Sequence, residues 1–171
     1  MDTKVYFSGA QDHVIDDGGR IAIPSSMYSM LKNTAQPDTL YAQAAKRVIS
    51  NGRTFRFVKL LRYEVLHERA SRLMAEFTSD DERDQFGEVF FSKFKPLEIK
   101  VPQPRVTLPT DWLKERKSKT ASKDQAFLSN NVTVAGVGEV IEIWNVDDWK
   151  ERQAASESDK TSASGSQAMG A

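Results

Sequence analysis

The chain of 171 residues contains no cysteine, which excludes disulfide bonds, thiolate metal sites and a cysteine nucleophile. No apolar run approaches the roughly 20 residues that a transmembrane helix requires. The first residues lack the long apolar region of a signal peptide. The formal net charge is zero, since 24 Lys and Arg residues balance 24 Asp and Glu residues. This balance argues against a nonspecific nucleic-acid coat, so we expect a soluble, cytoplasmic protein whose cationic surfaces are local.

Signatures of familiar enzymes are absent as well. The sequence has no Gly-x-Ser-x-Gly, P-loop or His-Glu-x-x-His motif, and these motifs mark common hydrolases, nucleotide-binding enzymes and metalloproteases. Its two histidines, His13 and His67, have no partner at ligand spacing, so we expect no metal site. The stretch Gly136-Val137-Gly138 is too short for a dinucleotide fingerprint and lies between two expected strands. We therefore expect no enzyme activity and no cofactor.

The stretch from Asp16 to Pro24 is the most informative part of the chain. Two aspartates followed by Gly18 and Gly19 predict a tight turn, because Gly adopts positive φ without steric cost and Asp caps turns. Arg20 follows the turn, and the alternation of Ile21-Ala22-Ile23 is typical of a half-buried strand. Pro24 ends this strand, and a short helix over 25–32, capped by a serine, is expected next.

A second, altered copy of this stretch occurs later in the chain. An offset of 85 residues carries Arg20 onto Arg105 and Pro24 onto Pro109, with the apolar pair Val106 and Leu108 between them. Thr110 then stands as a helix cap before Trp112 and Leu113. An internal repeat of this size predicts two similar halves packed about a pseudo-twofold axis.

The rest of the chain predicts further strands and helices. Asn51-Gly52 is a strong hairpin signal, and Ser79 with Glu82 forms a capping box. The expected strands cover 4–9, 14–15, 40–49, 54–58, 97–101, 132–137 and 140–144, and two helices over 63–77 and 79–90 form a hairpin between the repeats. The segment 42–45 fits a helix as well as a strand. Asn145 is expected to cap a short final helix, and from 152 onward the composition predicts a disordered tail.

These features resemble the MraZ family of bacterial transcriptional regulators. The resemblance covers roughly residues 5 to 151. It depends on Asp16-x-x-Gly19-Arg20-Ile21-x-Ile23-Pro24, on the repeat at Arg105 to Pro109, and on Val134-Ala135-Gly136-Val137-Gly138-x-x-Ile141-Glu142-Ile143-Trp144 followed by Trp149. It implies an α+β fold, namely a duplicated AbrB-like swapped-hairpin β-barrel with a helical hairpin between the repeats. The repeats would span 5–75 and 76–151, followed by the tail 152–171.

The same resemblance implies a function. Such a protein would be a sequence-specific regulator that binds double-stranded DNA at direct repeats, as a ring-shaped homo-oligomer associated with the nucleoid. Its targets would be the division and cell-wall gene cluster, including its own promoter. Two alternatives remain at this point. One is an oligomeric scaffold of the same fold that does not bind DNA. The other is an antitoxin-type AbrB-like protein, against which the fused repeat and the Glu142-Ile143-Trp144 ending argue.

The candidate DNA-binding residues follow from the two repeated stretches and one hairpin turn; they are Arg20, Asp16, Gly18, Gly19, Arg53 and Arg105. The fork of Arg20 is suited to guanine or phosphate, although Arg20 could instead pair with Asp16 and stiffen the turn, and both roles are compatible. The second copy departs from the family pattern, with Val101 in place of Asp and Pro104 in place of Gly, so its binding role is in doubt.

Other charged and aromatic residues have simpler interpretations. Nine basic residues between 32 and 72, against three acidic ones, fit either a phosphate track or solvated faces, and Arg53 in its hairpin turn is the best placed of them. The lysine-rich loop 114–123 could likewise contact phosphate, but a mobile surface loop is the simpler interpretation. The aromatic residues at strand or helix spacing are expected in the core; they are Phe55, Phe57, Trp112, Trp144 and Trp149.

Overall fold

The computed structural model describes residues 4–115 and 126–168 of the chain, with side-chain burial up to Glu157. The loop 114–123 of the sequence analysis therefore lies largely outside the described residues. The strands are β1 (Ala10–Val14), β2 (Arg20–Ala22), β3 (Thr39–Val48), β4 (Thr54–Leu61), β5 (Lys95–Glu98), β6 (Arg105–Thr107), β7 (Asn131–Val137) and β8 (Val140–Asn145). The helices are α1 (Ser25–Leu31), α2 (Tyr63–Met74), α3 (Asp80–Ser92), the 3-10 helix η1 (Thr110–Trp112) and α4 (Val146–Ala168). Within these ranges, no helix combines the length and the apolar character needed to cross a membrane.

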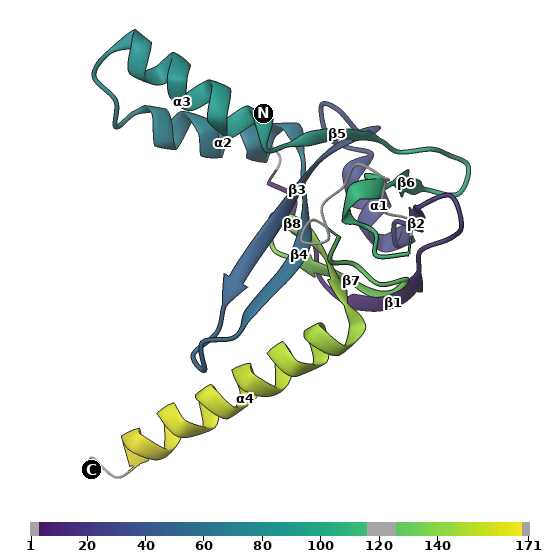
Figure 1. Ribbon diagram of the computed structural model, residues 1–171, viewed down its shortest axis with the longest axis vertical. Helices are drawn as coiled ribbons and strands as arrows, with labels where there is room; N and C mark the ends of the chain where they lie inside the picture. Colours follow the sequence, from purple (N-terminus) through teal and green to yellow (C-terminus); the bar gives the residue numbers. More distant parts are fainter. Residues whose placement is uncertain (1–3, 116–125, 169–171) are drawn as a thin grey trace.

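Six strands form one antiparallel sheet in the order β1-β7-β8-β4-β3-β5, and β2 pairs with β6 in a separate two-stranded ribbon (Figure 1). The predicted mixture of helices and strands is thus confirmed. The predicted closed barrel is wrong, because β1 and β5 stand at opposite edges of the six-stranded sheet. The sheet buries its apolar face under the ribbon and the short helices instead, so pairing of its edges is not needed to shield the core.

The main core lies between the inner face of the six-stranded sheet and the β2–β6 ribbon. Val58 and Ile143 at the centre of the sheet are fully buried, and Ile21 and Val106 of the ribbon are 1% and 0% exposed. All four belong to one apolar cluster. The period-2 alternation that predicted the ribbon strands is therefore what fixes their inward and outward faces.

Strands of the two repeats pair with each other. In the ribbon Ile21 pairs with Val106, and in the sheet Val58 pairs with Ile143. The two residues of each pair are 85 positions apart, so each residue pairs with its own equivalent in the other repeat. In addition, β1 of the first half pairs with β7 of the second, and β5 of the second half pairs with β3 of the first. Strands of the two halves are thus interleaved in a single sheet.

Several local predictions are confirmed. Segment 39–48 is a strand, which resolves the choice between strand and helix at 42–45. Gly52 has φ +83° in the turn between β3 and β4, and the Arg53 N–H donates to Asn51 Oδ1 at 2.9 Å. Ser79 caps α3 by accepting the Glu82 N–H at 3.2 Å. Of the five aromatic residues expected in the core, four are buried, and the half-buried Trp149 packs against three of them.

Other boundaries differ from the predictions. The predicted strand over 4–9 is wrong, because Gly9 at φ +86° interrupts the pairing and leaves Phe7 in an isolated bridge to Gly138. The first strand is β1, and the predicted strand over 14–15 overlaps it only at Val14. Strand β5 covers 95–98 rather than 97–101, since Lys100 already bonds to Arg105 across the next loop.

The expected helix caps also differ. Helices α1 and η1 start after Pro24 and Pro109 and have no side-chain cap hydrogen bond. Asn145, expected as a cap, instead donates to the Phe127 carbonyl and accepts the Ser129 N–H. Pro24 and Pro109 fix the backbone conformation where these two helices begin. The Asn145 side chain is instead bonded to the neighbouring loop that contains Phe127 and Ser129.

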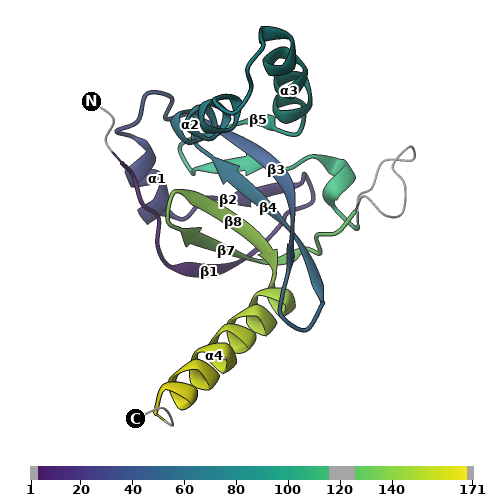
Figure 2. The ribbon, with the colours of Figure 1, turned by 90° about the vertical axis from the view of Figure 1, so that its left-hand side faces the viewer.

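The outer face of the sheet carries helices α2 and α4, which leave it in different directions (Figures 1 and 2). A second small core lies beneath the start of α4, where Trp144 stacks on Phe57 at 4.3 Å between ring centroids. Residues 152–168, expected as a disordered tail, continue α4. Asp147 and Asp148 in its first turn complement the helix dipole, which favours continuation of the helix from this anchored start.

Candidate functional site

The loop before β2 holds Asp16 and Arg20 in one network. Asp16 Oδ1 accepts the backbone N–H groups of Gly18 and Arg20, both at 2.9 Å. Asp16 Oδ2 pairs with Arg20 Nε at 2.7 Å. The ion pair uses Nε, so the two terminal amino groups of the guanidinium are not needed for the bond to this carboxylate. The pairing and the outward-facing role that the sequence left open are therefore compatible in one geometry.

The electrostatics of this loop stabilise the charged form of Asp16. The hydrogen bond from the Arg20 backbone N–H lowers the pKa of the Asp16 carboxyl below its ordinary value of 3.8, with further lowering by the Arg20 side chain and the Gly18 N–H. Hydrogen bonds to the ionised form of a carboxyl always act in this direction. Asp16 therefore remains an anion that orients Arg20 at physiological pH.

The two glycines have separate roles in the same turn. Gly19 has φ +78°, and a Cβ there would lie 3.2 Å from Leu113 Cδ1. A Cβ at Gly18 would lie 3.1 Å from Arg20 Nε and 3.4 Å from Asp16 Oδ1. Gly19 thus permits the backbone turn, and Gly18 leaves room for the ion pair.

The β2–β6 ribbon brings Arg105 onto the same surface as Arg20. Arg20 pairs with Thr107, and Ala22 pairs with Arg105. These four residues are exposed, whereas Ile21 and Val106 between them are buried. Residues opposite each other in an antiparallel pair project from the same face. The outer face of the ribbon therefore displays both arginines on one diagonal, an arrangement that the separate sequence motifs did not predict.

The second loop differs from the first in its bonding. Lys100 and Arg105 exchange two backbone hydrogen bonds at 2.9 and 3.1 Å, and the Pro104 carbonyl accepts the Ile23 N–H at 2.9 Å. No carboxylate of the described residues pairs with Arg105 in the way that Asp16 pairs with Arg20. Between the loops lies a hollow of about 200 Å³, lined by residues that include Asp16, Arg20, Pro104 and Arg105.

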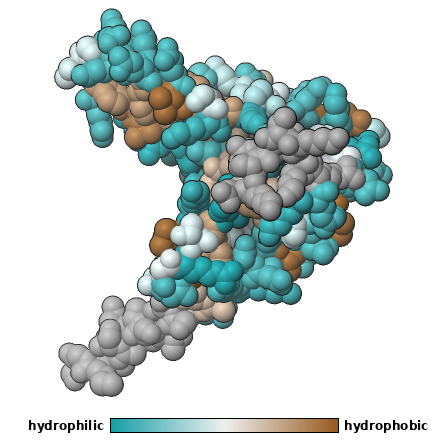
Figure 3. Space-filling model, in the orientation of Figure 1, coloured by the Kyte–Doolittle hydropathy of each residue, from teal (hydrophilic) through white to brown (hydrophobic). Residues whose placement is uncertain are grey.

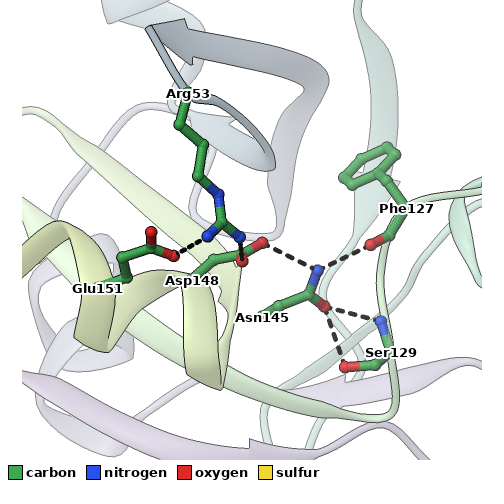
Figure 4. Close-up of polar contacts among 6 residues, drawn as sticks. All are labelled: Arg53, Phe127, Ser129, Asn145, Asp148 and Glu151. Atoms are coloured by element: carbon green, nitrogen blue, oxygen red, sulfur yellow. Dashed lines mark hydrogen bonds and ion pairs between the residues drawn. The ribbon is translucent and has the colours of Figure 1, made fainter. Parts of the chain in front are cut away.

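Arg53 lies elsewhere and is engaged. It follows the β3–β4 turn, where its guanidinium pairs with Asp148 at 3.2 Å and with Glu151, both on α4 (Figure 4). Asp148 also accepts a hydrogen bond from Asn145, whose side chain is tied to Ser129 and Phe127. Arg53 thus joins the hairpin to α4, and the structure does not bring it together with Arg20 and Arg105.

A buried carboxylate on the outer face of the sheet escaped the sequence reasoning. Glu142 is 1% exposed and accepts hydrogen bonds from Arg47 Nη2 at 3.3 Å and from Trp144 Nε1 at 3.0 Å. Lys59 of β4 lies directly opposite Glu142 of β8 in the sheet. The signal available in the sequence was a charged residue flanked by Ile141 and Ile143 in a strand of otherwise apolar residues.

Comparison with models of known protein families and with the sequences of curated proteins finds no match.

Proposed function

We propose that this chain is a sequence-specific DNA-binding regulator of the MraZ type, built on an AbrB-like exchange of hairpins between its two halves, and that the β2–β6 ribbon is its reading element. The observation that carries the proposal is that Arg20 and Arg105 are exposed on the same face of the β2–β6 ribbon. The two strands of this ribbon are equivalent segments of the internal repeat. The interleaving of strands from the two halves supports the fold assignment.

The dimensions of the ribbon suit the major groove of DNA. A two-stranded β-ribbon fits into that groove, and an arginine fork binds the O6 and N7 atoms of guanine. Diagonal neighbours across an antiparallel pair lie about 7–8 Å apart, which corresponds to roughly two steps of about 3.4 Å along a DNA strand. Arg20 and Arg105 are thus spaced to reach base pairs about two steps apart.

Asp16 makes Arg20 the stronger of the two readers. Its carboxylate fixes Nε at 2.7 Å and leaves the terminal amino groups for the base. An arginine held in place before binding loses less side-chain entropy on contact. Arg105 has no such partner among the described residues, so it contributes less to the same contact. Arg53 is left out of the reading element because two carboxylates of α4 engage it.

Repetition of the ribbon compensates for the absence of net positive charge. A single ribbon neutralises few phosphates, so one copy of the chain binds weakly. A ring of several copies would present several ribbons to direct repeats, and the second and later contacts would then form at a high effective concentration. Sites in the chain's own promoter and in the division and cell-wall cluster are the proposed targets.

The test is a binding titration with DNA from immediately upstream of the gene. Fluorescence anisotropy at several salt concentrations should give tighter binding than a shuffled sequence of the same composition, and the preference should persist as salt weakens both. Equal affinity for the two DNAs at every salt concentration would overturn specific recognition. Equal weak binding together with a large particle mass would instead favour the oligomeric scaffold.

The scaffold alternative has one observation in its favour. No residue from Ser71 to Pro96 is buried, although this stretch contains all of α3 and five phenylalanines. Helices in proteins depend largely on packing of an apolar face. A hairpin with so little buried surface offers a surface for protein contact whether or not the ribbon binds DNA.

A further inference from the structure

The helical hairpin α2–α3 has a small interior of its own and little contact with the rest of the chain. The buried residues of α2 all lie in its first two turns, at Val65, Leu66 and Ala70, and α3 has none. Beyond them the rings of the hairpin contact one another, as Phe77 does with Phe86 and Phe86 with Phe90. Apolar surface is visible along the hairpin in Figure 3. Val89 is 59% exposed and Leu73 is 44% exposed, so this apolar surface lacks a cover.

Helix α3 is strongly acidic as well as uncovered. It carries five carboxylates and one arginine; these are Asp80, Asp81, Glu82, Asp84, Glu88 and Arg83. Asp80 pairs with Arg83, and the Glu82 backbone is held by the Ser79 cap. Asp84 and Glu88 are both exposed and lie one turn apart on the helix. A partner surface for α3 must therefore combine cations with apolar or aromatic groups.

The outer face of the sheet offers such a surface beside the start of α4. Three cations interact with the Glu142 carboxylate: Arg47 forms an ion pair with it, and Lys59 and Arg152 are close enough for electrostatic attraction. We name Arg47, Lys59 and Arg152 the cation cluster. Arg47 lies 5.0 Å from the Phe57 ring centroid, and Arg152 lies 5.4 Å from that of Trp144. With Glu142 the group has three positive charges against one negative charge. The cluster thus combines excess cations with an aromatic floor.

The charges of the cluster are poorly compensated from within the described chain. Arg47 Nη1 is buried without a hydrogen-bond partner there. Burial lowers the pKa of Lys59 and of Arg152, and the neighbouring Arg47 lowers both further against the opposing effect of Glu142. An additional carboxylate arriving at this surface would favour the charged forms of Lys59 and Arg152.

Ring symmetry decides which surfaces can meet. A closed ring of more than two copies needs a head-to-tail interface in which two different surfaces of the chain contact each other. The hairpin must then dock on something other than a second hairpin. The cation cluster lies on the outer face of the sheet, and the ribbon with Arg20 and Arg105 lies against the inner face. Contacts at the cluster would leave the ribbon free.

We propose that helix α3 of one copy docks, through its exposed Asp84–Glu88 turn, on the cation cluster of the next copy. This inference rests on the ring of the proposed function. It assigns the two halves of the interface to residues that are far apart in one chain, with the Asp84–Glu88 turn of α3 opposite Lys59 and Arg152.

Reciprocal charge changes in the two surfaces test this pairing. The measurement is light scattering after size-exclusion chromatography, with every sample at the same micromolar concentration. The helix variant is Asp84→Lys/Glu88→Lys, and the cluster variant is Lys59→Gln/Arg152→Glu, which leaves the Arg47–Glu142 bond intact. Each variant alone should fall to the mass of one chain, 19.2 kDa. An equimolar mixture, or one chain with all four changes, should recover the mass of the wild-type ring.

A matched control is Asp38→Lys/Glu98→Lys, two exposed acidic residues where β3 meets β5, which should keep the ring mass. Thermal melts of each variant separate loss of fold from loss of assembly. A cluster variant that stays in a ring, or a mixture that stays monomeric although both variants melt as wild type, overturns the pairing. A wild-type chain of monomer mass overturns it too, while the separate DNA titration would still decide specific binding.

Discussion

At the scale of single residues, the molecule uses the same residue type in three ways. Arg20 is held by Asp16 through Nε, Arg53 is held by two carboxylates of α4, and Arg105 has no carboxylate among the described residues. Only an arginine that is both exposed and oriented has its fork ready for a base. Local pairing, more than the number of arginines, therefore determines which of them is expected to read DNA.

Replacing Arg20 with Ala should remove specific DNA binding, whereas Arg105→Ala should weaken it much less. The reason is that Asp16 orients Arg20, while Pro104 before Arg105 has no N–H to offer a phosphate. A bidentate arginine–guanine contact contributes about 1–3 kcal/mol, multiplied over the copies in a ring. The measurement is a titration of both variants at fixed salt, with thermal melts as the fold control. Loss of binding in Arg105→Ala alone would contradict the assignment of the first loop.

Protonation of Asp16 should destabilise the first loop only in acid. Because the folded-state pKa lies below the ordinary 3.8, the stabilisation from the charged carboxylate is present above that value and is lost as the pH falls through the folded pKa. The gap in unfolding free energy between wild type and Asp16→Asn should therefore close in strong acid. Side-chain NMR titration of Asp16 should also show a depressed pKa that stays partly depressed in Arg20→Ala, since the main cause is the Arg20 backbone N–H. A gap that widened in acid would contradict this linkage.

At the scale of elements, the sequence predicted what local chemistry determines. Gly18-Gly19, Asn51-Gly52 and the Ser79 cap set their own turns, and each was found where the residues indicated. The arrangement of the sheet could not be read in this way. Whether β1 meets β5 or stops at an edge depends on contacts between residues more than 80 positions apart, which no local pattern encodes.

In the candidate site, too, contacts between residues close in the sequence could be predicted, and contacts between distant residues could not. Asp16 and Arg20 are four residues apart, so their pairing could be predicted from spacing. The shared face of Arg20 and Arg105 follows from the register of β2 against β6. The engagement of Arg53 by Asp148 and Glu151 likewise joins distant parts of the chain. The repeat offset was the one sequence signal that could have indicated the ribbon, because pairing about a pseudo-twofold axis sets Ile21 against Val106.

Strand β7 and the N-terminal segment are in close contact at Gly136. A Cβ at this position would lie 2.6 Å from the Phe7 carbonyl carbon and closer still to the Ser8 nitrogen. Gly136→Ala should therefore force the backbone apart and destabilise the fold by about 1–3 kcal/mol, measured by denaturant unfolding.

Gly87→Ala is the matched control for this change. A Cβ at Gly87 meets nothing closer than Met74 Cε at 3.6 Å, and the position lies inside α3, where Ala is favoured over Gly by about 0.5–1 kcal/mol. The control should therefore be stabilised or unchanged. Equal destabilisation by both substitutions would show that helix or strand context, rather than the approach of Phe7 and Ser8, sets the cost.

At the scale of the whole molecule, the two faces of the sheet are assigned different tasks. The inner face buries the core and supports the ribbon with its two arginines. The outer face carries α2, α4 and the cation cluster around Glu142. With no excess of positive charge overall, a single copy has little nonspecific attraction to DNA. In the proposed ring, affinity would come from the number of ribbons that act together, and specificity from the bases that Arg20 contacts and from the spacing of the sites.

This separation predicts how binding depends on the number of sites. Wild-type protein should bind DNA with two or three direct repeats far more tightly than DNA with one repeat, because each further contact is intramolecular and can raise avidity by about 100-fold or more. Asp84→Lys/Glu88→Lys and Lys59→Gln/Arg152→Glu change the net charge in opposite directions, by +4 and −3. Both should bind single-repeat DNA and lose the gain from added repeats, since both break the assembly and leave Arg20 intact. Anisotropy titrations on DNAs of equal length with one, two and three repeats measure this gain, and scrambled phasing of the repeats serves as the control. If the gain followed net charge, rising in one variant and falling in the other, the effect would be nonspecific attraction to phosphate, and assembly through α3 would not be its source.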